Sequence, residues 1–189
     1  MADILFITED YLKSMSTINE NVDFKILLPT IIMVQDIYLQ KILGTPLYND
    51  LKTKVSANPS LSSYPNEKDL IDNYISKTLI WYIKMESAME FKFHSMNKGI
   101  QVKSSDNSQG AETSDLKYLM NEWRMKAERY SQLLTNHLLL NTAIFPVFLK
   151  IQLDGMQPAL KDFTNGIYMN NYGKNNKLQK GANGADYYF

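Results

Sequence analysis

The 189-residue chain carries 20 basic and 20 acidic side chains, a formal net charge of zero, and no cysteine. The balanced charge argues against a protein that holds nucleic acid by a basic field. The lack of cysteine excludes disulfide frameworks and thiolate metal sites, and it fits assembly in a reducing cytoplasm. The first residues do not resemble a signal peptide. The apolar run over residues 26–34 is too short to cross a bilayer, so we expect one soluble domain without membrane contact.

The N-terminal region predicts an extended arm followed by two helices. Residues 4–7 are apolar and are expected to pack on the core. Thr8 can cap a short helix that follows this arm. Asn21 or Asp23 can cap a longer helix that begins near Phe24, where apolar residues recur at three- and four-residue steps.

This longer helix is expected to break in its second half. Gly44 occupies the position of a left-handed C-terminal cap. Thr45 followed by Pro46 is typical of an N-cap and a first helical position. A second, shorter helix then extends to about Val55. Gly44, Thr45 and Pro46 therefore mark a helix break at which two helices meet at an angle.

Two long amphipathic stretches follow, over residues 66–97 and 114–141, and Asn66 can cap the first. They are expected to pair as an antiparallel hairpin in which residues whose numbers add up to about 212 face each other, such as Tyr82 and Tyr130. An unbroken first helix would be about 48 Å long at ~1.5 Å per residue. Some of its apolar surface is therefore expected to meet another helix or another subunit.

The loop over residues 99–114 is longer than a helix connection needs, so it is functional, a small hairpin or disordered. In the tail, residues 150–172 are expected to dock on this domain or a neighbour, and residues 173–186 to form a tether; a tail disordered throughout is the alternative. The predicted fold is an all-α bundle with a long helix hairpin, residues 1–149, and an extended C-terminal tail, residues 150–189. The candidate partner contacts are Lys98, Gly99, Lys103, Phe163, Tyr168, Tyr172, Tyr187, Tyr188 and Phe189.

No catalytic constellation is visible, and we expect neither an enzyme nor a bound cofactor or metal. The two histidines are His94 and His137, and the second is expected to have a structural role near the end of its helix. Glu86, Glu90 and His94 lie one turn apart but lack the spacing of a di-iron bundle, so a solvated face is favoured. No phosphate loop, dinucleotide motif or nucleophile elbow occurs in the sequence.

Several short motifs carry a resemblance to a known family. They are Phe6-Ile7-Thr8, Asn21-Val22-Asp23, Leu27-Leu28-Pro29, Gln35-Asp36 and, above all, Ile42-Leu43-Gly44-Thr45-Pro46-Leu47-Tyr48, with Asn97-Lys98-Gly99 and Lys103-Ser104-Ser105 in the loop. These residues resemble the head-to-tail connector, or adaptor, proteins of tailed bacteriophages, especially the ring proteins of crAss-like phages. The similarity covers residues 5–139 and leaves the tail outside it.

This resemblance implies an all-helical structural protein of the virion. Its subunits would form a homo-oligomeric ring, commonly of twelve, at the head–tail junction, after assembly in the host cytoplasm. The ring would dock on the portal protein and on a neighbouring tail or ring protein. Double-stranded DNA would pass through it during ejection without sequence-specific binding, which suits a chain of zero net charge.

The alternative is a helical DNA-binding regulatory protein, because a helix, a break and a helix can resemble a helix-turn-helix. The second helix, however, offers only Lys52 and Lys54 as basic residues, with Asp50 beside them. An enzyme is the third and least favoured reading.

Overall fold

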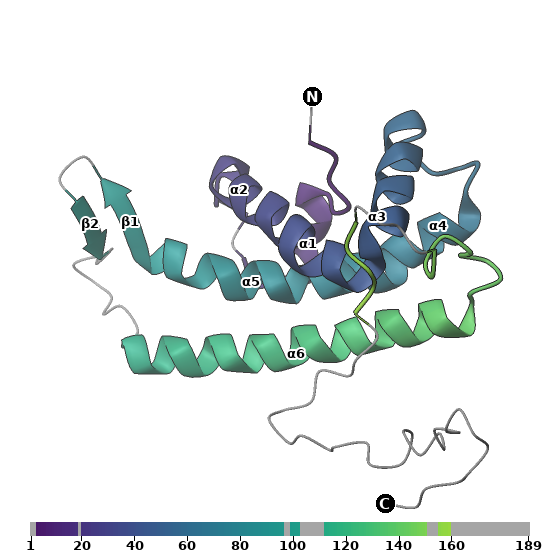
Figure 1. The fold of residues 1–189 in the computed structure, drawn as a ribbon. Coiled ribbons are helices and arrows are strands. Elements are labelled where there is room, and N and C mark those ends of the chain that lie inside the picture. Colours follow the sequence, from purple (N-terminus) through teal and green to yellow (C-terminus); the bar gives the residue numbers. More distant parts are fainter. Residues whose placement is uncertain (1–2, 19, 97–98, 103–111, 151–154, 160–189) are drawn as a thin grey trace, which may run out of the picture.

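The computed structural model describes residues 3–18, 20–96, 99–102, 112–150 and 155–159. Within these residues the fold is all-α, as predicted, apart from one short hairpin. Figure 1 shows α6 along one side of the molecule, α5 packed against it, and α1 to α3 on the opposite side of α5. The elements in chain order are α1 (Glu9–Met15), α2 (Phe24–Val34), the π-helical turn η1 (Gln35–Leu39), α3 (Gln40–Ala57), α4 (Pro65–Leu70), the π-helical turn η2 (Ile71–Ile75), α5 (Ser76–Lys92), β1 (Phe93–Met96), β2 (Gly99–Val102) and α6 (Thr113–Leu140).

The N-terminal arm packs on the core as expected. Phe6 and Ile7 are buried, and the Phe6 backbone N–H donates a 2.7 Å hydrogen bond to the side chain of Gln35. The hydroxyl of Thr8 accepts from the third residue beyond it and caps α1. Of the two predicted caps for α2, the structure uses Asp23, whose carboxylate accepts from a backbone N–H 3.0 Å away.

The helical run before the loop differs from the prediction at both ends. It begins at Pro65, so the predicted cap Asn66 is wrong; proline suits the first helical position because its missing N–H needs no partner there. The run ends at Lys92 instead of residue 97, because Phe93 turns to extended backbone and starts β1. Of the three alternatives for the loop, a small hairpin is present over β1 and β2.

The predicted helix hairpin is confirmed. Ser131 Oγ donates to the Tyr82 hydroxyl at 3.2 Å, one residue away from the expected Tyr130. The rings of Tyr74 and His137 stack with centroids 4.0 Å apart, one residue to the other side of the predicted register. His137 therefore has a packing role near the end of α6, as expected.

Candidate functional site

The helix break has a backbone geometry that few residue types can adopt. Gly44 has φ 74° and ψ 153°, a non-helical conformation that puts a kink within α3. The positive φ agrees with the predicted cap, but the ψ value lies outside the left-handed helical region, in a part of φ/ψ space that essentially only glycine occupies. Gly44 therefore sets the angle between the two halves of α3.

The tail returns to this break, which the sequence pattern did not predict. We call residues 155–159 the return segment. The backbone N–H of Thr45 donates to the carbonyl of Met156 at 2.8 Å, and the Met156 N–H donates to the Thr45 hydroxyl at 2.8 Å. The N–H of Ala159 donates to the Lys41 carbonyl at 3.0 Å. These bonds hold the return segment against the start and the middle of α3.

Close packing at the break also requires glycine. A Cβ atom on Gly44 would lie 2.8 Å from Cδ of Pro158, closer than real Cβ contacts come, and 3.1 Å from its backbone nitrogen, which is tighter than most such contacts. The prediction that Thr45 is the N-cap of the following helix is wrong, because its hydroxyl has other partners. Its hydroxyl accepts from Met156 and from the Gln40 side-chain amide, so it joins the return segment to α3 instead of capping the helix that follows.

The prediction that residues 150–172 dock on this domain or a neighbour is confirmed for the return segment, which docks on its own domain, and stays a prediction for the other residues of this stretch. The remaining tail residues named above lie outside the residues that the structure describes, as do Lys98 and Lys103 of the loop. Gly99 begins β2 and pairs with Met96. The tail residues outside this description are Phe163, Tyr168, Tyr172, Tyr187, Tyr188 and Phe189.

The basic residues of the second half of α3 are neutralised within the domain. Lys54 Nζ lies 2.8 Å from an Asp50 carboxylate oxygen and 2.7 Å from one of Glu67. Lys52 Nζ lies 3.6 Å from Asp36 and 4.5 Å from the centre of the Tyr48 ring. These lysines bind carboxylates of their own chain, which leaves little positive charge for phosphates.

The glutamates of α5 hold α2 and η1 in place. The Tyr38 hydroxyl donates to Glu86, and Thr30 Oγ1 donates to Glu90 at 2.8 Å. Burial, and next the hydrogen bond to Glu86, raise the pKa of Tyr38 well above its usual range. Glu86 is half-buried and Glu90 is exposed, so the expectation of a solvated face holds for Glu90, although both carboxylates also accept hydrogen bonds from neighbouring helices.

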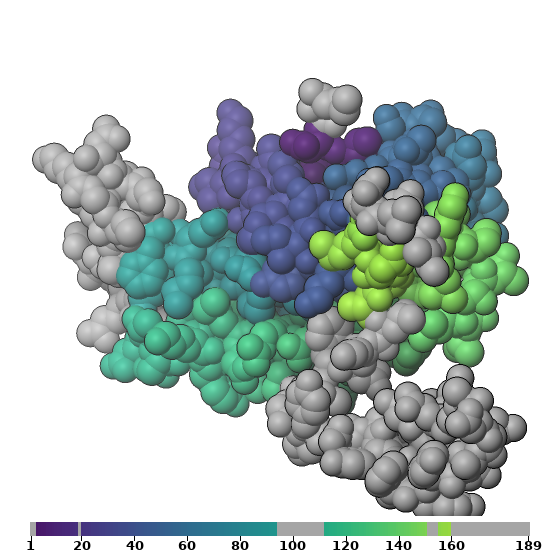
Figure 2. All heavy atoms as spheres, in the orientation of Figure 1, coloured from purple at the N-terminus to yellow at the C-terminus, as the bar shows by residue number. Residues whose placement is uncertain are grey.

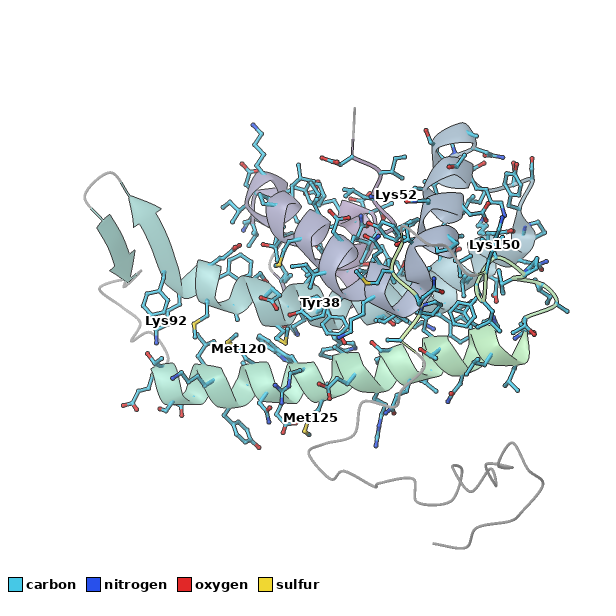
Figure 3. All side chains as sticks on the ribbon, in the orientation of Figure 1. Tyr38, Lys52, Lys92, Met120, Met125 and Lys150 are labelled. Atoms are coloured by element: carbon cyan, nitrogen blue, oxygen red, sulfur yellow. The ribbon has the colours of Figure 1, made fainter. Side chains whose placement is uncertain are left out.

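A second face of interest runs along the outside of α6. We call it the outer stripe, and it consists of Tyr118, Met125, Leu133 and Leu140, which are 70%, 41%, 51% and 85% exposed. Steps of seven and eight residues return to the same side of an α-helix. Figure 3 shows Met120 directed towards α5 and Met125 on the opposite side of α6. In Figure 2 α6 forms an edge of the coloured body, with no coloured segment beyond it.

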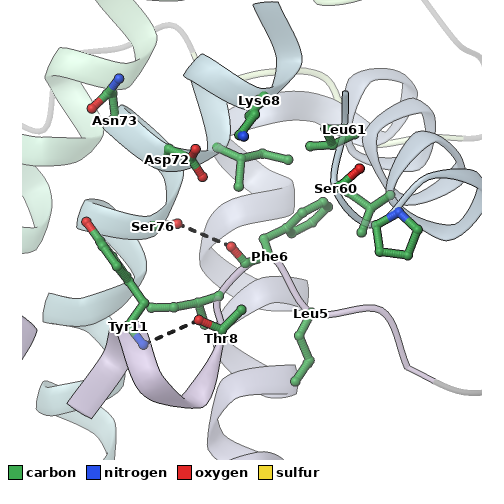
Figure 4. Close-up of a pocket in the computed structure, with 14 residues that line it drawn as sticks. Leu5, Phe6, Thr8, Tyr11, Ser60, Leu61, Lys68, Asp72, Asn73 and Ser76 are labelled. Carbon is green, nitrogen blue, oxygen red and sulfur yellow. Dashed lines mark hydrogen bonds between the residues drawn. The ribbon is translucent and has the colours of Figure 1, made fainter. Parts of the chain in front are cut away.

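A cavity lies beside the N-terminal arm. It has a volume of about 600 Å³ and lies between the arm, the loop after α3 and η2 (Figure 4). Ser76 Oγ donates to the Phe6 carbonyl at 3.2 Å within it, and Lys68 and Asp72 are its charged residues. Its lining contains no histidine that could act as a base for a serine. The described residues contain no cluster of three or more histidine, aspartate or glutamate side chains placed to bind a metal ion.

One stretch, Phe24–Ala57, is long and apolar enough to cross a membrane by length and composition alone. The kink at Gly44 divides it, and it carries core residues such as Ile31 and Leu43 that are fully buried against the rest of the domain. Gln35 lies in the same stretch and bonds the N-terminal arm through both ends of its amide. These contacts are those of a core helix of a folded domain.

Comparison with known proteins adds a family and no activity. No curated protein and no solved structure matches the chain. The family model called DUF6712, described as a family of unknown function, matches residues 39–152, from the end of η1 past the end of α6. Because this match spans more than half of the chain, the protein belongs to the DUF6712 family.

Proposed function

We propose that this protein is a structural subunit of a head-to-tail connector ring in a tailed bacteriophage. In this role, copies pack side by side around the DNA channel, one end of the ring docks on the portal, and the loop or tail reaches a neighbouring tail or ring protein. The observation that carries the proposal is the outer stripe of α6. Its four apolar side chains follow a helix of 28 residues, about 42 Å at ~1.5 Å per residue, and no described segment covers them.

An exposed apolar stripe of this length favours contact with another protein surface. A second copy of the chain can supply that surface, since homo-oligomers with closed symmetry are the common form of soluble assemblies. A ring needs two different faces on each subunit, because its contacts are head to tail. Ile26 and Ile37 are exposed on α2 and η1, on the other side of α5 from α6, and offer an apolar counterpart for the stripe.

The end of α6 offers a separate surface for an axial partner. Leu139, Ile144 and Leu149 are exposed where the helix gives way to the following turns. These residues lie close together in sequence at one end of the long hairpin. We assign this end, rather than the outer stripe, to contact with the portal or an adjacent ring.

The alternative, a DNA-binding regulator, is less well supported. The lysines of the second half of α3 are paired with Asp36, Asp50 and Glu67. A recognition helix needs free basic and polar side chains that reach base edges and phosphates. The proposed conduit instead needs weak phosphate contacts, so we expect the assembled ring not to bind duplex DNA strongly at physiological salt.

The test is the assembly state of the full chain, measured by light scattering alone and with the portal of the same phage. We expect rings, at least on the portal, and we expect Met125→Glu combined with Leu133→Glu to prevent them, because two buried charges would oppose the contact. Asn49→Glu and Lys117→Glu together are the control, since both positions are exposed outside the stripe. A chain that stays monomeric or dimeric with portal would contradict the proposal.

A further inference from the structure

A small pocket with an unusual lysine lies between α5, α6 and the loop after α1. Its volume is about 200 Å³, and its walls are mainly apolar: Ile18, Val22, Ala88, Phe91 and Trp123. Lys84 lines it as well, although only 7% of this residue is exposed. A pocket of this size and polarity fits a single apolar or aromatic side chain.

The ammonium group of Lys84 has neutral partners. Its Nζ donates to Thr17 Oγ1 at 2.9 Å and lies 4.7 Å from the ring centre of Trp123 and 5.1 Å from that of Trp81. No carboxylate within the described part of the chain forms an ion pair with it. Lys126 lies 4.8 Å from the centre of the Trp81 ring and adds a second positive charge.

These surroundings favour an anion. Burial lowers the pKa of Lys84, and the charge of Lys126 lowers it further. A buried ammonium group without a carboxylate is costly, and a carboxylate brought into contact with it would remove much of that cost. The pocket is therefore complementary to a side chain that is apolar and lies next to an acidic group.

We propose that this pocket binds residues 186–189 of the same chain, with the Asp186 carboxylate against Lys84 and an adjoining aromatic ring in the apolar part. This sequence, Asp-Tyr-Tyr-Phe, places one acid directly before three aromatic residues. Residues 173–185, which precede it, contain one large apolar side chain, that of Leu178. Within residues 173–189, residues 186–189 are thus the part that can fill such a pocket.

The tail is long enough to reach it. Twenty-six residues lie between Ala159, whose N–H is bonded to Lys41, and Asp186, and this length of chain spans up to about 90 Å when extended. This exceeds the length of α6, about 42 Å. A tethered segment also has an effective concentration far above that of a free partner, which favours binding within one chain over binding between chains.

The experiment uses the full chain, whose two tryptophans, Trp81 and Trp123, both lie beside Lys84. Asp186→Asn should increase quenching of tryptophan fluorescence by acrylamide, because the pocket empties. Asp162→Asn is the matched control, since Asp162 also precedes an aromatic residue, Phe163. An unchanged signal in Asp186→Asn, or the same increase in Asp162→Asn, would overturn the proposal.

A synthetic peptide of residues 184–189 gives a second readout. Added to the Asp186→Asn chain, it should restore the protected fluorescence, and Lys84→Met should weaken its binding about tenfold or more, as loss of a charge-assisted hydrogen bond does. Lys117→Met, an exposed position on α6, should leave peptide binding unchanged. Protection in the unaltered chain that disappears on dilution would identify a second copy as the occupant and overturn binding within one chain. Because ring formation is measured separately, either result is distinguishable from failure of the proposed function.

Discussion

Gly44→Ala should destabilise the domain by more than its single methyl group suggests. The added Cβ would lie 2.8 Å from Pro158 Cδ and 2.9 Å from Cγ, so the return segment must move. In addition, φ 74° with ψ 153° is strained for any residue with a side chain, and such strain costs about 1–3 kcal/mol. Three hydrogen bonds of the return segment, to Thr45 and Lys41, are at risk, each contributing about 0.5–1.5 kcal/mol.

The expected loss is therefore about 2–5 kcal/mol in the free energy of unfolding, measured by urea denaturation followed by circular dichroism. A double-mutant cycle with Pro158→Ala separates the two causes. Removing the proline ring should recover part of the loss, because Cδ and Cγ are gone, but the strain at residue 44 and the contact with the backbone nitrogen at 3.1 Å remain. A loss below about 0.5 kcal/mol for Gly44→Ala would refute this account, since ordinary surface substitutions have effects of that size.

Two further changes test the core. Burial, and next a hydrogen bond to an acidic side chain, raise the pKa of Tyr38 and of Tyr48, so the folded state favours their neutral forms. The stability that this contributes is present below pH 10 and should be lost as the pH rises above it. In urea midpoints measured over a series of pH values, Tyr38→Phe combined with Tyr48→Phe should flatten this alkaline decline. Phe148→Ala should cost about 3–5 kcal/mol in denaturation experiments, because its ring is fully buried; a small loss would mean that the chain after α6 is not part of the core.

Periodicity and capping chemistry predict the long hairpin well, because both helices bury one continuous face. The spacing of apolar residues and equal distances from the loop predict the register to within one residue of the observed pairs, Tyr82 with Ser131 and Tyr74 with His137. The end of α5 at Lys92 could not be predicted in the same way. The apolar pattern continues through Phe93 and Met96, and these residues suit a strand as well as a helix, so tertiary pairing decides between them.

The surroundings of charged side chains on α5 are the second feature that the sequence does not show. Lys84 and Glu86 follow the spacing of an ordinary solvated helix face, and nothing local shows that Thr17 and Tyr38 approach them. These partners lie 67 and 48 residues away in the chain. A single sequence contains the residue types of such a contact but not the fold that brings them together, and this is why the Lys84 pocket could not be predicted.

The helix break shows how a local motif acquires its meaning from a distant segment. A glycine followed by threonine and proline predicts a turn between helices. Such a turn alone does not require these three residues, because other turn sequences also change the direction of the chain. Beyond its backbone conformation, glycine is needed here because Pro158 occupies the space that a Cβ would take. The Thr45 hydroxyl likewise accepts from Met156, 111 residues along the chain. The family match, residues 39–152, contains the break but ends before the return segment begins. If the return segment is what this motif binds, relatives that share the break should carry an extended segment after the last helix, with a residue that packs flat against the glycine.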